Sequence, residues 1–586
     1  MFYYEFLVDV PSVQGKIVRK KQSGKVFIQL ETGRTYFPDK QYTKPERVTI
    51  GKVDEEDENK MHPNESFFIH FPDVVIPEMR EESRRSSCLK IGSYIVIEKV
   101  IKELGLDRIL REVMHENANL VLDLAAYCIV SEDNAAQYYP DYNYNHGLFT
   151  TNMYMYSDSS VSRFFQNLDA SDIQKVLNKW NDKMDKSQKI YFSYDSTNKN
   201  TQAGDLDIAE FGHSKDDKGL PVFNFSIAYD QSNSIPLFYE CYPGSIPDVA
   251  QLRYTIDRAR GFGYSNMGVI IDRGYFTRDC LEYIVSNGFS YLAMMKGQKK
   301  LVASIIKEHR GTFEDKNAYY ISQYETYGIT VEMKLFASDS YNSHIHLYYN
   351  GFRAANEKSR FLNTINELNK FLNTKAVGQV YVETEFSRTY LNIVRDKDGK
   401  VLFARQNDEA IDEATVLMGY TAIVTSDAMP AKEALFRYKS RDVSEKLFRT
   451  DKTFLGARSE RVYSAESTRA KIFVEFIALI IRNRIFTLLR ESVINKNIKD
   501  NFMTVPAAIK ELEKIESVKL SNGKYMLDHA VTRNQKTILS SFGLTEIDVR
   551  AKAVEIRKLL ESVTDNETAD ETNNCDKEED DNNGTC

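Results

Sequence analysis

The chain has 586 residues, of which 42% are hydrophobic and 12% aromatic, so it is too long for one hydrophobic core and too apolar to be disordered. Its net charge of −8 comes from the C-terminal segment 564–586, which holds nine acids and one lysine, so residues 1–563 are nearly neutral and can carry basic surfaces. Six scattered cysteines without a CxxC pair argue against a disulfide framework or a zinc site, and we expect neither a signal peptide nor a membrane partner.

The N-terminal part of the chain changes from a strand pattern to a helix pattern. Residues 1–65 alternate like short strands separated by glycine turns, and the basic cluster Arg19–Lys21 is interpreted as a solvated hairpin edge. From about Ser93 the apolar residues recur at helical spacing, with Gly105 as a helix stop. We therefore predict a β-hairpin region followed by a helical domain at 66–189, which can bind DNA but shows no helix-turn-helix signature.

Residues 190–295 combine strands with helices in a recognisable order. The pattern is three strands, a helix, a strand, a helix and a strand, which is the order of an RNase H-like fold. Asp195 ends the first strand and Asp272 ends the fourth. These two strands are neighbours in such a sheet, so we expect the two acids to lie close together.

The rest of the chain is predicted to interrupt and then complete this core. Strands expected at 331–338, 344–351, 379–386 and 389–396, around a helix near 356–372, indicate a β-rich insertion. The core then returns with a strand near 421–427 and two helices, at 431–452 and 466–489. The predicted class is thus α/β, an RNase H-like core interrupted by an insertion, with domains at 1–65, 66–189, 190–295, 296–418, 419–490, 491–563 (helical) and 564–586 (a disordered acidic tail).

Four polar residues of the predicted helix 431–452 fall on one stripe. At about 100° per residue, Tyr438, Arg441, Glu445 and Lys452 lie within about 60° of one another. A carboxylate flanked by two cations and a phenol can hold a metal ion while the cations neutralise phosphates. The ordinary alternative is a solvated helix face with ion pairs between successive turns.

Three acids in this setting suggest phosphoryl transfer. Convergent carboxylates such as Asp195, Asp272 and Glu445 can hold two Mg²⁺ ions, one for the attacking oxygen and one for the leaving oxygen. Two other candidates are weaker. His344 and His346 share a strand face, but without a third ligand we interpret them as surface residues. Glu475, within an apolar helix, is interpreted as a buried and paired acid.

The motifs around these acids resemble a known family. YDSTN surrounds Asp195, IIDRGYF surrounds Asp272, and residues 438–452, YKSRDVSEKLFRTDK, fit the pattern Tyr-x2-Arg-x3-Glu-x6-Lys at every spacing. The chain resembles DDE transposases of the insertion-sequence group that this pattern marks, over roughly residues 45–490.

The resemblance implies a function and a set of roles. Asp195, Asp272 and Glu445 would bind Mg²⁺, or Mn²⁺ in its place, for cleavage at the ends of a mobile element and attack of the freed 3′-hydroxyl on target DNA. Tyr438, Arg441 and Lys452 would contact the end DNA. The partners would be double-stranded DNA (terminal inverted repeats and target) and a second copy of the chain, in the cytoplasm of a bacterium near the nucleoid.

Two alternatives remain open. A catalytically inactive or domesticated DNA-binding protein would keep the fold without cleavage, although the three intact acids argue against it. Another RNase H-like nuclease or resolvase would use the same metals without the Tyr-Arg-Glu-Lys stripe.

Overall fold

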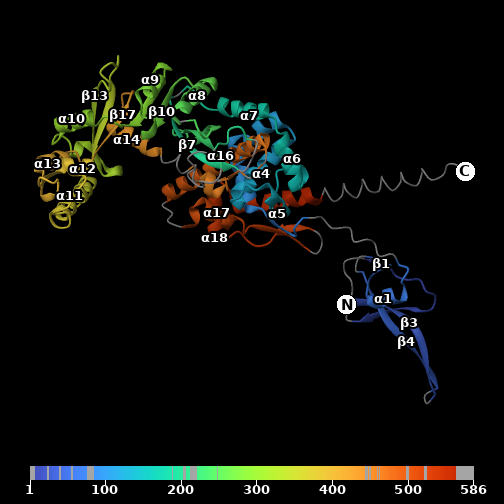
Figure 1. Ribbon diagram of the computed structural model, residues 1–586. Coiled ribbons are helices and arrows are strands. Elements are labelled where there is room, and N and C mark those ends of the chain that lie inside the picture. Colours follow the sequence, from blue (N-terminus) through green and yellow to red (C-terminus); the bar gives the residue numbers. More distant parts are fainter. Residues whose placement is uncertain are drawn as a thin grey trace. The chain divides into compact units, whose positions relative to one another are not determined.

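The protein is described by a computed structural model and divides into two compact units, residues 1–85 and 86–586 (Figure 1). Each unit is treated by itself. The structure describes residues 7–22, 25–38, 41–54, 57–74, 85–187, 189–201, 206–210, 221–246, 248–441, 447, 450–457, 459–460, 462, 464–496, 501–520 and 524–561.

The first unit is an antiparallel sheet with one short helix, as the alternating pattern predicts. Its strand order is β1-β5-β4-β3-β2, and its core is formed by apolar residues such as Ile28, Ile50 and Met61, together with Phe67 of the helix. The elements are β1 (Val8–Asp9), β2 (Ile17–Gln22), β3 (Lys25–Phe37), β4 (Tyr42–Val53), β5 (Lys60–Pro63) and α1 (Glu65–His70).

The second unit begins with the predicted helices. Gly105 has φ 66°, a left-handed conformation that glycine adopts without strain, and it separates two of these helices. They surround α16 (Ala465–Lys496), a helix that is mostly apolar in its first half. The elements are β6 (Cys88–Lys90), α2 (Gly92–Leu104), α3 (Leu106–Met114), α4 (Asn117–Ser131), α5 (Tyr139–Asn145), α6 (Asp158–Asn167) and α7 (Ala170–Asp182).

The central sheet contains the strands that were predicted to carry the two aspartates. β7 pairs antiparallel with β8, and β8 with β9, whereas β10 pairs parallel with both β7 and β11. The spatial order is therefore β9-β8-β7-β10-β11, and the chain is a mixed α/β protein as predicted. The elements are β7 (Ile190–Thr201), β8 (Val222–Asp230), β9 (Ile235–Pro243), α8 (Asp248–Gly261), β10 (Met267–Ile271), α9 (Arg278–Ser286) and β11 (Ser290–Met294).

The region after β11 extends this sheet. β17 pairs antiparallel with β11, and β14 pairs with β17, so the strands following residue 296 continue the central sheet. A second small core forms between α11, β15 and β16. The elements are α10 (Lys299–His309), β12 (Tyr320–Ile321), β13 (Thr326–Met333), β14 (Ser343–Tyr349), α11 (Gly351–Thr374), α12 (Glu385–Tyr390), β15 (Leu391–Arg395), β16 (Val401–Gln406), α13 (Asp408–Val416) and β17 (Tyr420–Thr425).

One predicted strand of this region is wrong. Residues 379–386 do not form a strand: Val380 and Val382 are exposed, and α12 begins at Glu385. The Thr384 side chain accepts a hydrogen bond from the Ser387 N–H, so a threonine that favours a strand acts instead as a helix cap.

The C-terminal part combines helices with a β-hairpin that the sequence pattern did not reveal. β19 pairs with β20 and also with β6, which ties the end of the chain to the start of the second unit. The predicted acidic tail 564–586 lies outside the described residues. The elements are α14 (Ala431–Ser440), β18 (Ser459–Glu460), η7 (Asn501–Met503), α17 (Val505–Leu512), β19 (Glu516–Lys519), β20 (Tyr525–Leu527), α18 (Arg533–Ser540) and a helix at 546–561.

Two sequence-level expectations can be compared with this fold. Among the described residues, no helix has the length and apolar character needed to cross a membrane. The four cysteines that the structure describes, Cys88, Cys128, Cys241 and Cys280, are free thiols.

Candidate active site

The parallel pairing of β7 with β10 fixes the positions of the two predicted aspartates along the strands. Gly268 lies beside Tyr191 and Ile270 beside Ser193. Two residues further along the same register, Asp272 comes level with position 195. Neighbouring strands are about 4.8 Å apart, so the two acid positions are close in the backbone.

Both positions fall on the side of the sheet that α14 covers. Tyr191 and Ile270 pack in one cluster with Ala434 and Leu435 of α14. Since side chains alternate along a strand, positions 193 and 195 share the side of Tyr191, and position 272 shares the side of Ile270. The sheet and α14 together define the face on which the site would form.

Asp272 is a partly exposed carboxylate at the end of β10. Its Oδ1 accepts a hydrogen bond of 2.5 Å from the Arg273 N–H and forms an ion pair with Nη1 of Arg441. The Asp272 side chain remains 45% exposed, whereas that of Arg441 is only 12% exposed. The carboxylate is thus held in place from two directions and still open to solvent.

The helix that was predicted to carry the polar stripe is described only in part. α14 ends at Ser440, and Arg441 keeps a helical backbone conformation. Glu445 lies outside the described residues. The prediction that the helix continues without a break to Lys452 therefore falls on residues that the structure does not describe. Lys452 is described and lies in a helical turn, with its side chain partly exposed.

Tyr438 lies in the core rather than on the surface. It is 6% exposed and belongs to the cluster of apolar residues between α14 and the sheet. The guanidinium of Arg441 lies 5.2 Å from the centre of its ring. The ring of Tyr438 thus supports the arginine that contacts Asp272.

Gln231 connects β7 to α14, although no sequence pattern points to this residue. With its amide oriented to satisfy its neighbours, the side-chain oxygen accepts from Ser193 Oγ at 2.8 Å and from the Arg441 N–H at 3.1 Å, while the nitrogen donates to the Arg437 carbonyl. Arg437 also stacks on Tyr191, 3.6 Å from the ring centre. These contacts fix the C-terminal end of α14 against the strand that carries position 195.

A buried cluster of charged side chains lies at the C-terminal end of β7. Lys199 is fully buried, and its Nζ is 2.7 Å from Glu475, 3.0 Å from Asp451 and 3.2 Å from Glu460. Lys471 approaches Glu460 at 3.4 Å, and Asn134 donates to Glu475 at 2.7 Å. The cluster joins β7 to the segment that follows position 445 and to α16. It confirms that Glu475 is a buried, paired acid.

The cluster contains three carboxylates but only two ammonium groups. This excess of acidic groups favours protonation of one carboxylate. Burial and the nearby Glu460 raise the pKa of Glu475 to about 8, despite the contact with Lys199. Burial alone would lower the pKa of Lys199, but the three surrounding carboxylates raise it well above the usual lysine value. Lys199 therefore stays charged, and Glu475 is the acid that accepts a proton most readily.

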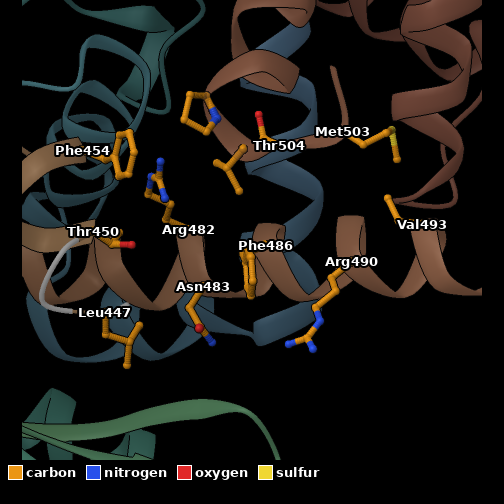
Figure 2. Close-up of a pocket in the computed structure, with 12 residues that line it drawn as sticks. Leu447, Thr450, Phe454, Arg482, Asn483, Phe486, Arg490, Val493, Met503 and Thr504 are labelled. Carbon is orange, nitrogen blue, oxygen red and sulfur yellow. The ribbon is translucent and has the colours of Figure 1, made fainter. Parts of the chain in front are cut away.

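A cavity of about 560 Å³ adjoins the same segment (Figure 2). Arg482 is 5% exposed and points toward Phe454, with its guanidinium 4.6 Å from the ring centre. Burial lowers the pKa of Arg482 to about 10. The walls are mainly apolar with two guanidinium groups, and they are formed by Leu447, Thr450, Phe454, Arg482, Asn483, Phe486, Arg490, Val493, Met503, Thr504, Val505 and Pro506.

The two histidines on β14 differ: His344 is partly exposed, whereas His346 is a core residue, so the prediction of a surface position is wrong for His346. His346 is fully buried between Thr330 and Thr425, whose hydroxyls lie 2.9 and 3.1 Å from its ring nitrogens. Burial and His344 lower the pKa of His346 to about 4. β14 lies inside the extended sheet, so the residue is a neutral, hydrogen-bonded core histidine.

Metal-binding residues can be assessed only where the structure describes them. Within the described part of the chain, no group of three or more His, Cys, Asp or Glu side chains is arranged to hold a metal ion. That part includes neither the side chain of Asp195 nor Glu445. What it does contain, the open Asp272 carboxylate level with position 195, fits the oxygen ligands that Mg²⁺ prefers.

Comparison with known proteins identifies the central part of the chain. Among solved structures, it is similar to a piggyBac transposase synaptic complex with hairpin DNA, at 8% identity and a TM-score of 0.28, over 70% of this chain and 64% of that one. The chain thus spans less than two thirds of that transposase's length. No curated protein matches. The family described as "Transposase DDE domain" matches residues 186–481, which is half of the 586 residues, and the chain belongs to this family.

Proposed function

We propose that this chain is a DNA transposase that cleaves the ends of a mobile element and joins the freed 3′-hydroxyl to target DNA. The observation that carries the proposal is the β7–β10 register, which brings the open carboxylate of Asp272 level with position 195. Family membership supports the same conclusion, because the matched residues 186–481 include all three predicted acids.

The core is proposed to be RNase H-like. The spatial order β9-β8-β7-β10-β11, with antiparallel first strands and parallel later ones, is the arrangement expected for that fold. The region from 296 to 418 would then be an insertion between the fifth core strand and the helix that carries the third acid. β17 and β14 attach this insertion to the edge of the core sheet.

Asp195, Asp272 and Glu445 are proposed as the metal ligands, for Mg²⁺ with Mn²⁺ as a substitute. Two divalent ions at such a site polarise the scissile phosphate and lower the pKa of the attacking water or hydroxyl. Asp272 is positioned for this role by the Arg273 N–H and by Arg441. Arg441 lies where it would also neutralise a phosphate bound beside that carboxylate.

The pattern Tyr438, Arg441, Glu445, Lys452 supports assignment to the insertion-sequence group of this family. In this reading the buried ring of Tyr438 supports Arg441, and Arg441 and Lys452 meet the end DNA. A bacterial element, recognition of terminal inverted repeats and a homodimeric complex belong to the same proposal, because two ends must be joined in one reaction.

The test is cleavage of a labelled duplex that carries the repeat flanking the coding region, with Mg²⁺ or Mn²⁺. Wild type is compared with Glu445→Gln and Asp272→Asn, and with Asp279→Asn, an exposed acid in the first turn of α9, as the control. We expect wild type and the control to nick at the repeat boundary, while the two site variants bind without cutting. If Glu445→Gln cuts as well as wild type, the third carboxylate is wrong. If all four proteins bind and none cuts, the chain is a DNA-binding protein that retains the fold.

A further inference from the structure

The hairpin β3–β4 extends beyond the core of the first unit (Figure 1). Ile28 and Leu30 of β3 are buried, but beyond them the strands pair from Gly33↔Glu46 to Phe37↔Tyr42 with no buried side chain. Five residues of each strand therefore form a two-stranded ribbon roughly 17 Å long. A ribbon with two solvated faces contributes little to the core of its own unit.

Three aromatic side chains lie at the tip of this ribbon. Tyr36 is 59% exposed, Phe37 41% and Tyr42 46%. Phe37 and Tyr42 face each other across the strands and stack, with ring centres 5.7 Å apart and planes 18° from parallel. None of the three belongs to the hydrophobic core of the unit. Exposed aromatic groups gathered at one point indicate a surface that binds a partner.

The ribbon and the adjacent strand β2 are strongly basic. Residues 16–47 hold nine lysines and arginines and three acids, a net charge of +6, whereas residues 48–85 have a net charge of −5. Glu31, one of the three acids, is already paired with Arg34 and Arg47. Lys20, Lys21 and Lys44 are exposed and have no ion-pair partner among the described residues. Lys44 lies on the ribbon opposite Thr35, whereas Lys20 and Lys21 lie opposite Phe27 and Val26 at the other end of β3, so the positive charge is distributed along the length of the hairpin.

We propose that the β2–β4 face of the first unit is a binding site for double-stranded DNA. In this proposal the ribbon enters a groove, Lys44 contacts a phosphate beside that groove, and Lys20 and Lys21 contact phosphates further along the duplex. A two-stranded β-ribbon fits the major groove, which is about 12 Å wide. The aromatic tip stacks on bases or packs on deoxyriboses, and neither contact requires a particular sequence.

This site lies outside residues 186–481, which the transposase family matches, and it assigns a role to the exposed edge strand β2, on which Arg19–Lys21 lie as predicted. The inference rests on the proposed function in that it supplies a DNA contact for the same enzyme. It is nevertheless testable without cleavage, because DNA binding is measured in the absence of divalent metal.

The experiment measures binding of the full chain to a labelled 40-base-pair duplex by fluorescence anisotropy, with EDTA, at several salt concentrations. One variant removes charge (Lys20→Gln, Lys21→Gln, Lys44→Gln). A second variant removes the aromatic tip but keeps residues that favour strands (Tyr36→Thr, Phe37→Thr). The matched control removes three exposed lysines of the second unit, two on α11 and one at its C-cap: Lys358→Gln, Lys370→Gln and Lys375→Gln.

The two variants are expected to differ in their salt dependence. The charge variant should weaken binding about 10- to 100-fold near 0.1 M salt and reduce the slope of log K against log salt by about 2 to 3, because each phosphate contact contributes about 0.9. The tip variant should weaken binding severalfold with the slope unchanged. The control should match wild type, and unchanged thermal unfolding would show that the variants remain folded.

Two outcomes separate this proposal from the function proposed above. If both ribbon variants bind as wild type does, the ribbon is not a DNA site, whatever the cleavage assay shows. If the ribbon variants lose binding while wild type fails to cleave, the DNA site stands and the transposase activity does not. Loss of binding in the control to the same extent would show a general charge effect and would overturn the proposal.

Discussion

Replacing Lys199 by methionine should destabilise the second unit strongly. The side chain is fully buried and lies within 2.7–3.2 Å of three carboxylates, so its loss leaves them with Lys471 alone, which approaches only Glu460. Methionine has nearly the same length as the lysine stem, so little void is created and the effect is mainly electrostatic. Removing one partner from a buried ion cluster costs about 3–5 kcal/mol.

The assay is urea unfolding followed by the fluorescence of Trp180, the only tryptophan of the chain. Trp180 is buried in the same unit and donates a hydrogen bond to the Pro236 carbonyl at 3.0 Å, so its emission reports on unfolding of that unit. The control is Lys175→Met, whose partner Asp172 lies 2.7 Å away on the surface. An exposed pair of this kind contributes little to stability, because water screens it.

The loss should also depend on pH. At pH 8, near the raised pKa of Glu475, the cluster carries more negative charge and shares one cation, whereas near pH 5 Glu475 is protonated, so the penalty of Lys199→Met should be smaller at the lower pH. A loss at pH 8 no larger than that of Lys175→Met would refute the reasoning. It would mean that the carboxylates find other partners or reach water when the lysine is absent.

Further predictions follow from the same side chains. The pKa of Glu475 is raised from 4.5 to about 8, so the folded state binds this proton more tightly than the unfolded state does. The stability of wild type should therefore fall as pH rises from 5 to 8, and Glu475→Gln should make that fall smaller when stability is measured by urea unfolding. The pKa of His346 is lowered to about 4, so protonation of this residue favours the unfolded state, and wild type should lose stability as pH falls from 6.5 toward 4. His346→Gln should lose less stability over that range. Arg441→Gln should slow end cleavage about 10- to 100-fold in single-turnover assays, because it removes a charged hydrogen-bonding group at Asp272. Chelation of divalent metal should abolish cleavage, while gel shifts still show DNA binding.

The order of the core strands could be predicted because it depends on local patterns. Each strand from β7 to β11 is a short apolar run bounded by turn residues, and such runs are visible in the sequence without any knowledge of their partners. Asp272 directly follows β10 as predicted, but β7 continues to Thr201, so Asp195 lies within its strand and the prediction that it ends that strand is wrong. The backbone register that brings Asp272 level with position 195 then follows from parallel pairing.

Contacts between distant segments could not be predicted in this way. Lys199 looks like an ordinary polar residue at the end of a strand, and its partners lie more than 250 residues later in the chain. His346 was interpreted as a surface residue because no third metal ligand was apparent, whereas the pairing of β14 with β17 puts it inside the central sheet. Gln231 gives no signal because its role depends on where α14 packs.

Arg441 and Asp451 are described residues that lie in sequence on either side of Glu445, the proposed third metal ligand. On one side, Arg441 is paired with Asp272 at the end of β10; on the other, Asp451 is paired with Lys199, four residues after Asp195 on β7. The segment that carries Glu445 is therefore fixed at both ends to the two strands that carry the aspartates.

This arrangement makes Lys199 a positioning residue, because it would act on Glu445 through Asp451 and touches no substrate. Lys199→Arg keeps the positive charge but changes the shape of the side chain. If Lys199 positions Glu445, this variant should remain folded at moderate urea concentrations and should still bind DNA, but it should cleave more slowly. Glu460, paired with Lys199 and Lys471 away from this segment, supplies the comparison. If Glu460→Gln reduces cleavage as much as Lys199→Arg at equal stability, the cluster acts only through stability, and the link between Asp451 and Glu445 has no special part in the reaction.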